Sequence, residues 1–150
     1  MLFVAFAAAL AITAAPIQES QAPRGPLTDV GGTPTMTFLV VGDTAPQVPR
    51  STIWVWSLYH PAVDLNGTAI DARAERLAID CANRTMTRTR WENHGGGRLQ
   101  VAGDANIGPL HAAPGNETER MVAVACGLDY PGRGSGLRFE TIEDAIADLR

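Results

Sequence analysis

Residues 52–59 read Thr-Ile-Trp-Val-Trp-Ser-Leu-Tyr, and this run constrains the fold more strongly than any other part of the chain. Nearly every residue in it is β-branched or aromatic, which predicts a β-strand. Side chains alternate along a strand, so this one would be apolar on both faces. The two sets are Trp54, Trp56 and Leu58 on one face, and Ile53, Val55 and Tyr59 on the other. Such a strand is expected to be covered on both sides.

The chain has 150 residues, the length of one domain of ordinary size. Its formal net charge is -4, and no block of like charges stands out. Binding through phosphate neutralisation needs a basic surface, so the composition argues against a nucleic-acid partner. All 12 basic residues are arginine, a bias typical of GC-rich bacterial genomes.

An uncharged apolar run occupies residues 2–15 and is followed by Pro16. The run is shorter than the ~20 apolar residues that span a bilayer, so we predict no membrane span. It is typical of the apolar part of a signal peptide, and a buried N-terminal helix is the alternative. We predict a signal peptide at residues 1–15 and a periplasmic or secreted envelope protein. No lipid anchor is expected, because no cysteine lies near the end of the run.

Residues 16–34 contain many Gln, Pro, Gly, Ser and Thr residues and few large apolar ones, which predicts a flexible leader. A single domain would then cover residues 35–150. It would open with a strand at residues 36–41, Met-Thr-Phe-Leu-Val-Val, ended by Gly42. We expect His60-Pro61 to end the aromatic strand that follows.

Cys81 and Cys126 are the two cysteines of the chain and lie far apart in sequence. In an oxidising compartment, an isolated pair of this kind predicts one disulfide. A pair of reduced thiols is the alternative. A redox-active pair is less favoured, because the chain has no Cys-x-x-Cys spacing.

A hairpin is predicted around the turn Ala82-Asn83. In residues 75–81, strict alternation places Leu77, Ile79 and Cys81 on one face. The partner strand, residues 84–92, is half polar, and its exposed side chains suit recognition of anionic groups. The candidate binding residues are Arg84, Arg88, Arg90 and Trp91. A solvated strand face, or a sheet edge protected by charge, is the alternative.

Two helices are predicted near the C-terminus. Asn116 and Glu119 have the spacing of a capping box, which predicts the start of a helix, and Gly127 is placed to end it. A strand is the alternative for this segment, because Val122 and Val124 are β-branched. If this segment is helical, its apolar face carries Cys126 toward the sheet. A second, short helix starts after Thr141, with apolar residues at helical spacing.

These elements form a pattern: an aromatic strand, a strand ending in Asp80-Cys81, a strand rich in Thr and Arg, then Pro114-Gly115, Glu119 and Cys126. The pattern resembles the surface-adhesin protein E family of exported bacterial proteins, over roughly residues 35–127. The resemblance implies an antiparallel β-sheet with a helix tethered to one face by a Cys81–Cys126 disulfide. With the short C-terminal helix added, the expected fold class is α+β.

The family's activity is adhesion to host matrix proteins, so we predict a non-enzymatic envelope protein that binds a protein or an anionic surface polymer. The alternative is a small periplasmic enzyme or ligand carrier with an unrecognised site. His60, His94 and His111 are expected in separate loops, so no metal site is predicted. No catalytic residues and no cofactor are predicted either, because Asp80 lacks an evident basic or nucleophilic partner.

Overall fold

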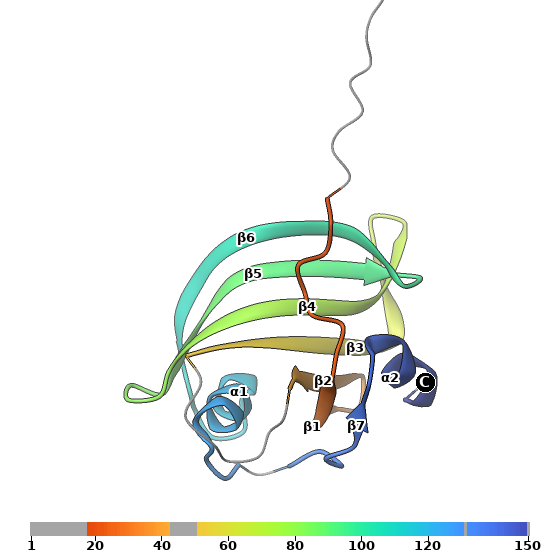
Figure 1. Ribbon diagram of the computed structural model, residues 1–150. Helices are drawn as coiled ribbons and strands as arrows, with labels where there is room; N and C mark the ends of the chain where they lie inside the picture. The colour runs from red at the N-terminus through yellow and green to blue at the C-terminus, as the bar shows by residue number, and fades with distance from the viewer. Residues whose placement is uncertain (1–17, 43–50, 131, 150) are drawn as a thin grey trace, which may run out of the picture.

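The computed structural model describes residues 18–42, 51–130 and 132–149. In these segments an antiparallel sheet of seven strands, in the order β6-β5-β4-β3-β2-β1-β7, dominates the molecule, and two short helices pack against it (Figure 1). The strands are β1 (Leu27–Thr33), β2 (Met36–Val41), β3 (Thr52–Leu65), β4 (Thr68–Asp80), β5 (Thr85–Gly95), β6 (Arg98–His111) and β7 (Arg138–Phe139). The helices are α1 (Glu117–Cys126) and α2 (Ile142–Asp148). The predicted antiparallel sheet with a disulfide-linked helix and a short C-terminal helix is confirmed, although the fold is mostly sheet.

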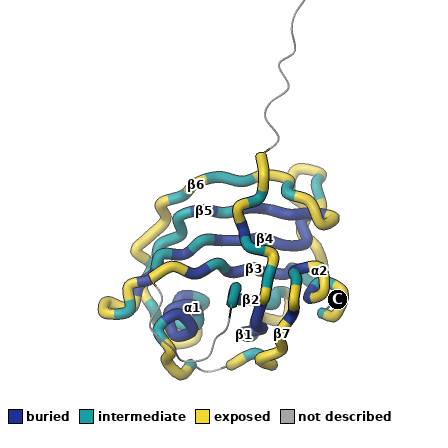
Figure 2. Tube along the Cα trace, viewed as in Figure 1, coloured by how far each residue is buried: buried dark blue, intermediate teal, exposed yellow. Residues whose placement is uncertain are grey.

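Strand β3 is covered on both faces along residues 53–58, as its sequence predicts, whereas residues 61–65 are exposed (Figure 2). Ile53 and Val55 belong to a core that includes Met121 and Val122 of α1. Trp56 and Leu58 belong to a second core on the opposite side, where Ile142 of α2 packs. We call these two sides the helix face, covered in part by α1, and the strap face.

The strap face takes its name from residues 20–26, which cross the strands before the chain enters β1 (Figure 1). Trp56 Nε1 of β3 donates a hydrogen bond of 2.9 Å to the carbonyl oxygen of Pro23. The amide of Ile142 at the start of α2 donates one of 2.7 Å to the carbonyl oxygen of Arg24. This strap is therefore a part of the fold.

The predicted flexible leader at residues 16–34 is wrong for the described part of that range. Residues 27–33 form β1, which pairs with both β2 and β7, and Leu27 and Val30 are buried. The segment Leu-Thr-Asp-Val-Gly-Gly-Thr has too few apolar residues for a periodic signal. Pairing with two neighbouring strands holds it in the sheet, so the domain includes residues that the sequence assigned to a linker. The predicted signal peptide at residues 1–15 lies outside the described residues.

Strand β3 continues past His60-Pro61, where the sequence predicted its end. The pairing with β4 shifts register between Leu58 and Val63, and this irregularity accommodates the proline. The hairpin then turns at Asn66 and Gly67, which both have positive φ, at 53° and 82°. Two such residues form the tight turn whose twist matches the strands.

Strand β5 extends past residue 92, its predicted end, and strands β5 and β6 contain two of the three histidines. His94 lies buried in β5 and His111 lies in β6, while His60 lies in β3. Their predicted placement in loops is therefore wrong. The sequence did not show this for His94 because three glycines follow it, and it did not show it for His60 because Pro61 follows it.

Helix α1 forms as its capping residues predict. The Asn116 side chain accepts a hydrogen bond of 2.7 Å from the amide of Glu119, and Gly127 closes the helix with φ 67°. The strand alternative for this segment is thereby excluded. Cys126, the last residue of α1, forms a disulfide with Cys81, directly after β4. The bond holds the C-terminal end of α1 at the end of the β4–β5 hairpin.

Helix α2 also forms as predicted. The Thr141 side chain accepts a hydrogen bond from the Asp144 amide, and the Asp144 carboxylate accepts one from the amide of Thr141. This reciprocal capping box fixes the start of a helix that is too short to be stable alone. Its residues Ile142 and Ala145 are buried against the strap face.

We expect Cys81→Ser and Cys126→Ser to lower the free energy of unfolding by the same amount, about 4 kcal/mol, since each variant removes the same cross-link. The double variant should lose no more than either single one. Urea unfolding of the three variants tests this. Single losses that add up in the double variant would show that the two cysteines stabilise the fold independently.

Candidate functional site

A β-bulge in β5 decides where the predicted binding residues lie. Leu77 of β4 pairs with Arg88 and Arg76 pairs with Arg90, so Thr89 is an extra residue in β5. The Thr89 hydroxyl donates a 3.1 Å hydrogen bond to the carbonyl oxygen of Arg76, which ties the bulge to β4. Because one inserted residue reverses the side-chain alternation, Arg88 and Arg90 point to opposite faces of the sheet.

Strict alternation along residues 84–92 would place Arg88 and Arg90 on one face and Trp91 with the threonines on the other. The structure contradicts this expectation, because it separates the two arginines. Trp91 also changes sides: it pairs with Glu75 and lies on the helix face with Arg88, not with the threonines of β5. Arg84 lies in the turn before β5, with φ 54°, and is exposed at the end of the hairpin. Of the four predicted residues, the structure brings together only Arg88 and Trp91.

Arg90 lies on the strap face in a buried polar cluster. Its side chain is 5% exposed, and its Nε lies 3.0 Å from a carboxylate oxygen of Glu92, which is fully buried. Glu92 also accepts hydrogen bonds from the strap, at 2.6 Å from the Ser20 hydroxyl and 2.8 Å from the Gln21 amide. Arg90 therefore helps to hold the strap against the sheet and is not available as an exposed binding residue.

The electrostatics of this cluster follow from its burial. Burial raises the pKa of Glu92, but hydrogen bonds from Ser20, Gln21 and Arg90 outweigh it and hold the pKa below its usual 4.5. Burial also lowers the pKa of His94 below 6.5, although Glu92, 3.4 Å from its Nε2, opposes this shift. The folded protein therefore favours an ionised Glu92 beside a neutral His94.

The helix face beyond α1 holds the candidate site. A hollow of about 290 Å³ opens there between the sheet and the start of α1. The residues that line it combine charged, hydroxyl and apolar side chains: Met36, Ser57, Tyr59, Arg73, Glu75, Arg88, Ile107 and Glu117. We call this hollow the helix-face site.

Four charged side chains of the helix-face site form a continuous network. Glu75 lies 3.1 Å from Arg73 Nη2 and 3.3 Å from Arg88 Nε. Arg88 Nη2 in turn lies 3.1 Å from Glu117, the first residue of α1. Two cations and two anions thus alternate across β4, β5 and the N-terminus of α1.

Two aromatic side chains border this network. The guanidinium carbon of Arg73 lies 5.5 Å from the centre of the Trp91 ring, a cation–π distance. A Cβ atom at Gly103 of β6 would lie 3.1 Å from the Trp91 ring, so this glycine leaves room for the indole. Burial raises the pKa of Tyr59, an effect that Arg73 opposes and that Glu75 and Glu117 reinforce. Tyr59 therefore stays a neutral hydroxyl that donates and accepts hydrogen bonds.

The sequence motifs did not indicate Tyr59, Arg73, Glu75 and Glu117 as site residues. Residues 72–75 read Ala-Arg-Ala-Glu, an alternation of small and charged side chains, and of these only Glu75 belongs to the strand predicted at residues 75–81. The same alternation is the available signal, because it puts Arg73 and Glu75 on one face of a strand. Nothing in the sequence indicates that Glu117 lies beside Arg88, which is 29 residues away.

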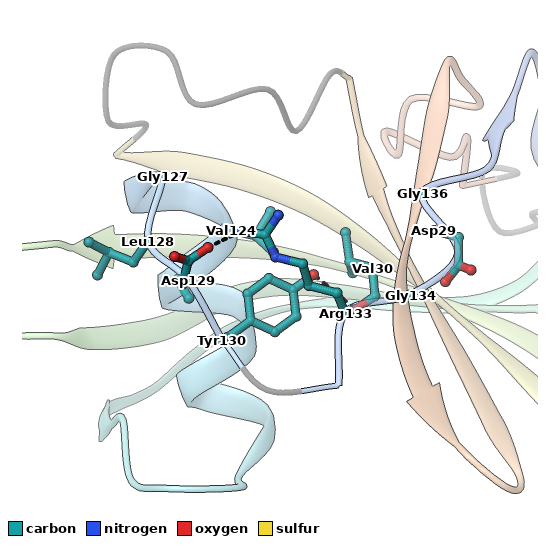
Figure 3. A pocket seen from close by; sticks show the side chains of 11 residues that line it. Asp29, Val30, Val124, Gly127, Leu128, Asp129, Tyr130, Arg133, Gly134 and Gly136 are labelled. Carbon is teal, nitrogen blue, oxygen red and sulfur yellow. Dashed lines mark hydrogen bonds and ion pairs between the residues drawn. The ribbon is translucent and has the colours of Figure 1, made fainter.

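A second hollow, of about 390 Å³, lies between β1, the end of α1 and the segments 128–130 and 132–136 (Figure 3). Its charged side chains bind one another or the backbone. Arg133 pairs with Asp129 and lies 5.7 Å from the Tyr130 ring centre. The Asp29 carboxylate points away from Tyr130 and accepts hydrogen bonds from the amides of Gly31 and Ser135. These contacts stabilise the described segments that border the second hollow.

Within residues 18–42, 51–130 and 132–149, no three His, Cys, Asp or Glu side chains gather as metal ligands would. Neither helix in the described part of the chain is long and apolar enough to span a membrane.

Comparison of the chain with protein-family models, with curated proteins and with solved structures found no match. The resemblance to the surface-adhesin protein E family therefore stays a prediction from the sequence motifs.

We expect Arg90→Gln to lower the free energy of unfolding by about 3 kcal/mol, because it leaves the buried Glu92 carboxylate without its cationic partner. Arg88→Gln is the matched control: Arg88 is partly exposed, and Glu75 keeps its contact with Arg73, so the loss should be about 1 kcal/mol or less. Urea unfolding measures both. Equal losses would contradict the separation of the two arginines by the bulge.

The free energy of unfolding should also decrease as the pH is lowered. Both Glu92 and His94 have folded pKa values below their ordinary ones, so the unfolded chain binds more protons and acid favours unfolding. The decrease should begin below about pH 6.5 through His94 and steepen below about pH 4.5 through Glu92. His94→Gln should remove the first decrease, whereas His111→Gln, at an exposed position, should retain it. Urea midpoints across this pH range measure the effect, and an unchanged profile in His94→Gln would refute the assignment.

Proposed function

We propose that this chain is an exported, non-enzymatic bacterial envelope protein that binds a protein or a surface polymer through the helix-face site. Two features support export: the signal-like apolar run at residues 2–15 and the disulfide between Cys81 and Cys126. Structural disulfides persist in oxidising compartments such as the bacterial periplasm. The proposed relationship to the surface-adhesin protein E family agrees with both features.

The observation that carries the binding proposal is the part of the helix face that α1 leaves uncovered. Trp91, Arg73 and Tyr59 are half-exposed there, on strands that a rigid sheet holds in place. Aromatic residues and arginine are the side chains most enriched in the centres of protein interfaces. Ile107 of β6, 51% exposed, and Val101 extend this surface toward the sheet edge.

The ligand-carrier alternative has one observation in its favour. Hydroxyl groups of Ser57 and Tyr59 and the charged network converge on a hollow of about 290 Å³. This volume is close to the lower end of ordinary small-molecule pockets. A carrier would bind a small molecule in this hollow, whereas an adhesin-like domain would use the wider surface around it.

Binding assays with immobilised extracellular-matrix protein and with alginate, an anionic polysaccharide, test the proposal. We expect the purified domain to bind one of these probes. Trp91→Ala and Arg73→Gln should each weaken binding about tenfold. Arg84→Gln is the control. It removes one positive charge, as Arg73→Gln does, but in the exposed turn before β5 and away from the helix-face site.

The melting temperature of each variant shows that the fold is retained. An equal effect of Arg84→Gln and Arg73→Gln would reveal attraction by net charge alone and would contradict a site on the helix face. Failure to bind either probe would also overturn the proposal.

A further inference from the structure

The charge network of the helix-face site is balanced, and this balance restricts what the site can bind. Glu75 is shared by Arg73 and Arg88, and Arg88 is shared by Glu75 and Glu117. Two guanidinium groups and two carboxylates leave no net charge. The site therefore differs from an arginine cluster that attracts any anion.

A simple anion would bind here at a cost. To accept a ligand carboxylate, Arg88 would have to weaken its contact with Glu117, whereas Glu75 would keep its contact with Arg73. A carboxylate that loses its cationic partner in this partly buried hollow is unfavourable. A simple cation would likewise draw a carboxylate away from the arginine that it now contacts. A ligand that carries both charges can replace the partner of each group that it displaces.

The hydrogen bonds of the network are also incomplete. Among the described residues, the buried Nε atoms of Arg73 and Arg88 have no hydrogen-bond partner. Arg88 Nε lies 3.3 Å from Glu75, but the contact lacks the geometry of a hydrogen bond. Buried unsatisfied donors cost stability, so a shift of the two guanidinium groups around a new acceptor would be favourable.

From this network we infer that the helix-face site binds a zwitterionic ligand group, in which one amino acid carries both an ammonium and a carboxylate. Arg73 and Arg88 receive the carboxylate, and Glu117 receives the ammonium beside the Tyr59 hydroxyl. Met36 and Ile107 line the hollow with apolar side chains, and these suit an aliphatic substituent on the same ligand. The inference rests on the proposed binding role of this face and names its ligand as an α-amino acid group.

Three matched compounds test the inference: L-leucine, N-acetyl-L-leucine, which lacks the ammonium, and L-leucinamide, which lacks the carboxylate. Titration of the whole domain, followed by the NMR signal of the Trp91 indole, measures each affinity. We expect saturable binding of L-leucine and about tenfold weaker binding of each blocked compound. N-acetyl-L-leucine that binds as tightly as L-leucine would show a simple anion site and would overturn the inference.

Two variants test which side chain binds the ammonium of the ligand and which binds its carboxylate. Glu117→Gln should abolish the preference for L-leucine over N-acetyl-L-leucine, and Arg88→Gln should abolish the preference over L-leucinamide. Glu143→Gln, an exposed carboxylate on α2, should change neither preference. Melting temperatures show whether each variant is folded. Because the readout is a ratio of two affinities within one variant, a partial loss of stability leaves the test decisive.

The outcomes separate this inference from the proposed function. If no leucine compound saturates while Arg73→Gln still weakens binding to matrix protein or alginate, the zwitterion site is wrong and the surface-binding role stands. If L-leucine binds with the expected dependence on Glu117 and Arg88 while neither macromolecular probe binds, the surface-binding role is wrong. The protein would then be a ligand carrier.

Discussion

The burial of β3 on both faces is the constraint on which the rest of the structure depends. Trp56 and Leu58 need cover on one side, and Ile53 and Val55 need cover on the other. In the described part of the chain, the seven-stranded sheet is accompanied by two short helices, which can cover little of its surface. Helix α1 is held in place by the disulfide and covers one core, while the strap and α2 cover the other. Each cover is tied to the sheet by a specific bond, since neither helix is long enough to be stable alone.

The two faces solve this problem with different chemistry. On the strap face, Glu92 is fully buried, and it binds Ser20 and Gln21 of the strap in addition to Arg90. These hydrogen bonds join the strap to β5, so the cluster serves the fold. On the helix face, α1 stops short of the strand ends, and the network from Arg73 to Glu117 remains partly exposed. That uncovered part of the sheet is the part that offers a function.

The bulge at Thr89 separates these two roles within one strand. Without it, Arg88 and Arg90 would share a face, as strict alternation predicts. With it, Arg90 turns to the buried carboxylate of the strap face and Arg88 to the helix-face site. The sequence Thr-Arg-Thr-Arg contains no mark of the extra residue. A bulge is set by how β5 fits the strands on both sides, so local pattern cannot reveal it.

The sequence by itself determined the elements whose causes are local. The two-sided strand β3 follows from its aromatic and β-branched residues, and both helix starts follow from capping side chains a few positions away. The tertiary structure alone decided that residues 27–33 join the sheet, that β3 passes through Pro61, and that Glu117 meets Arg88. These features depend on partners distant in the chain. A single sequence records the side chains that such contacts require, but their meeting is fixed only when the strands pair and the covers pack.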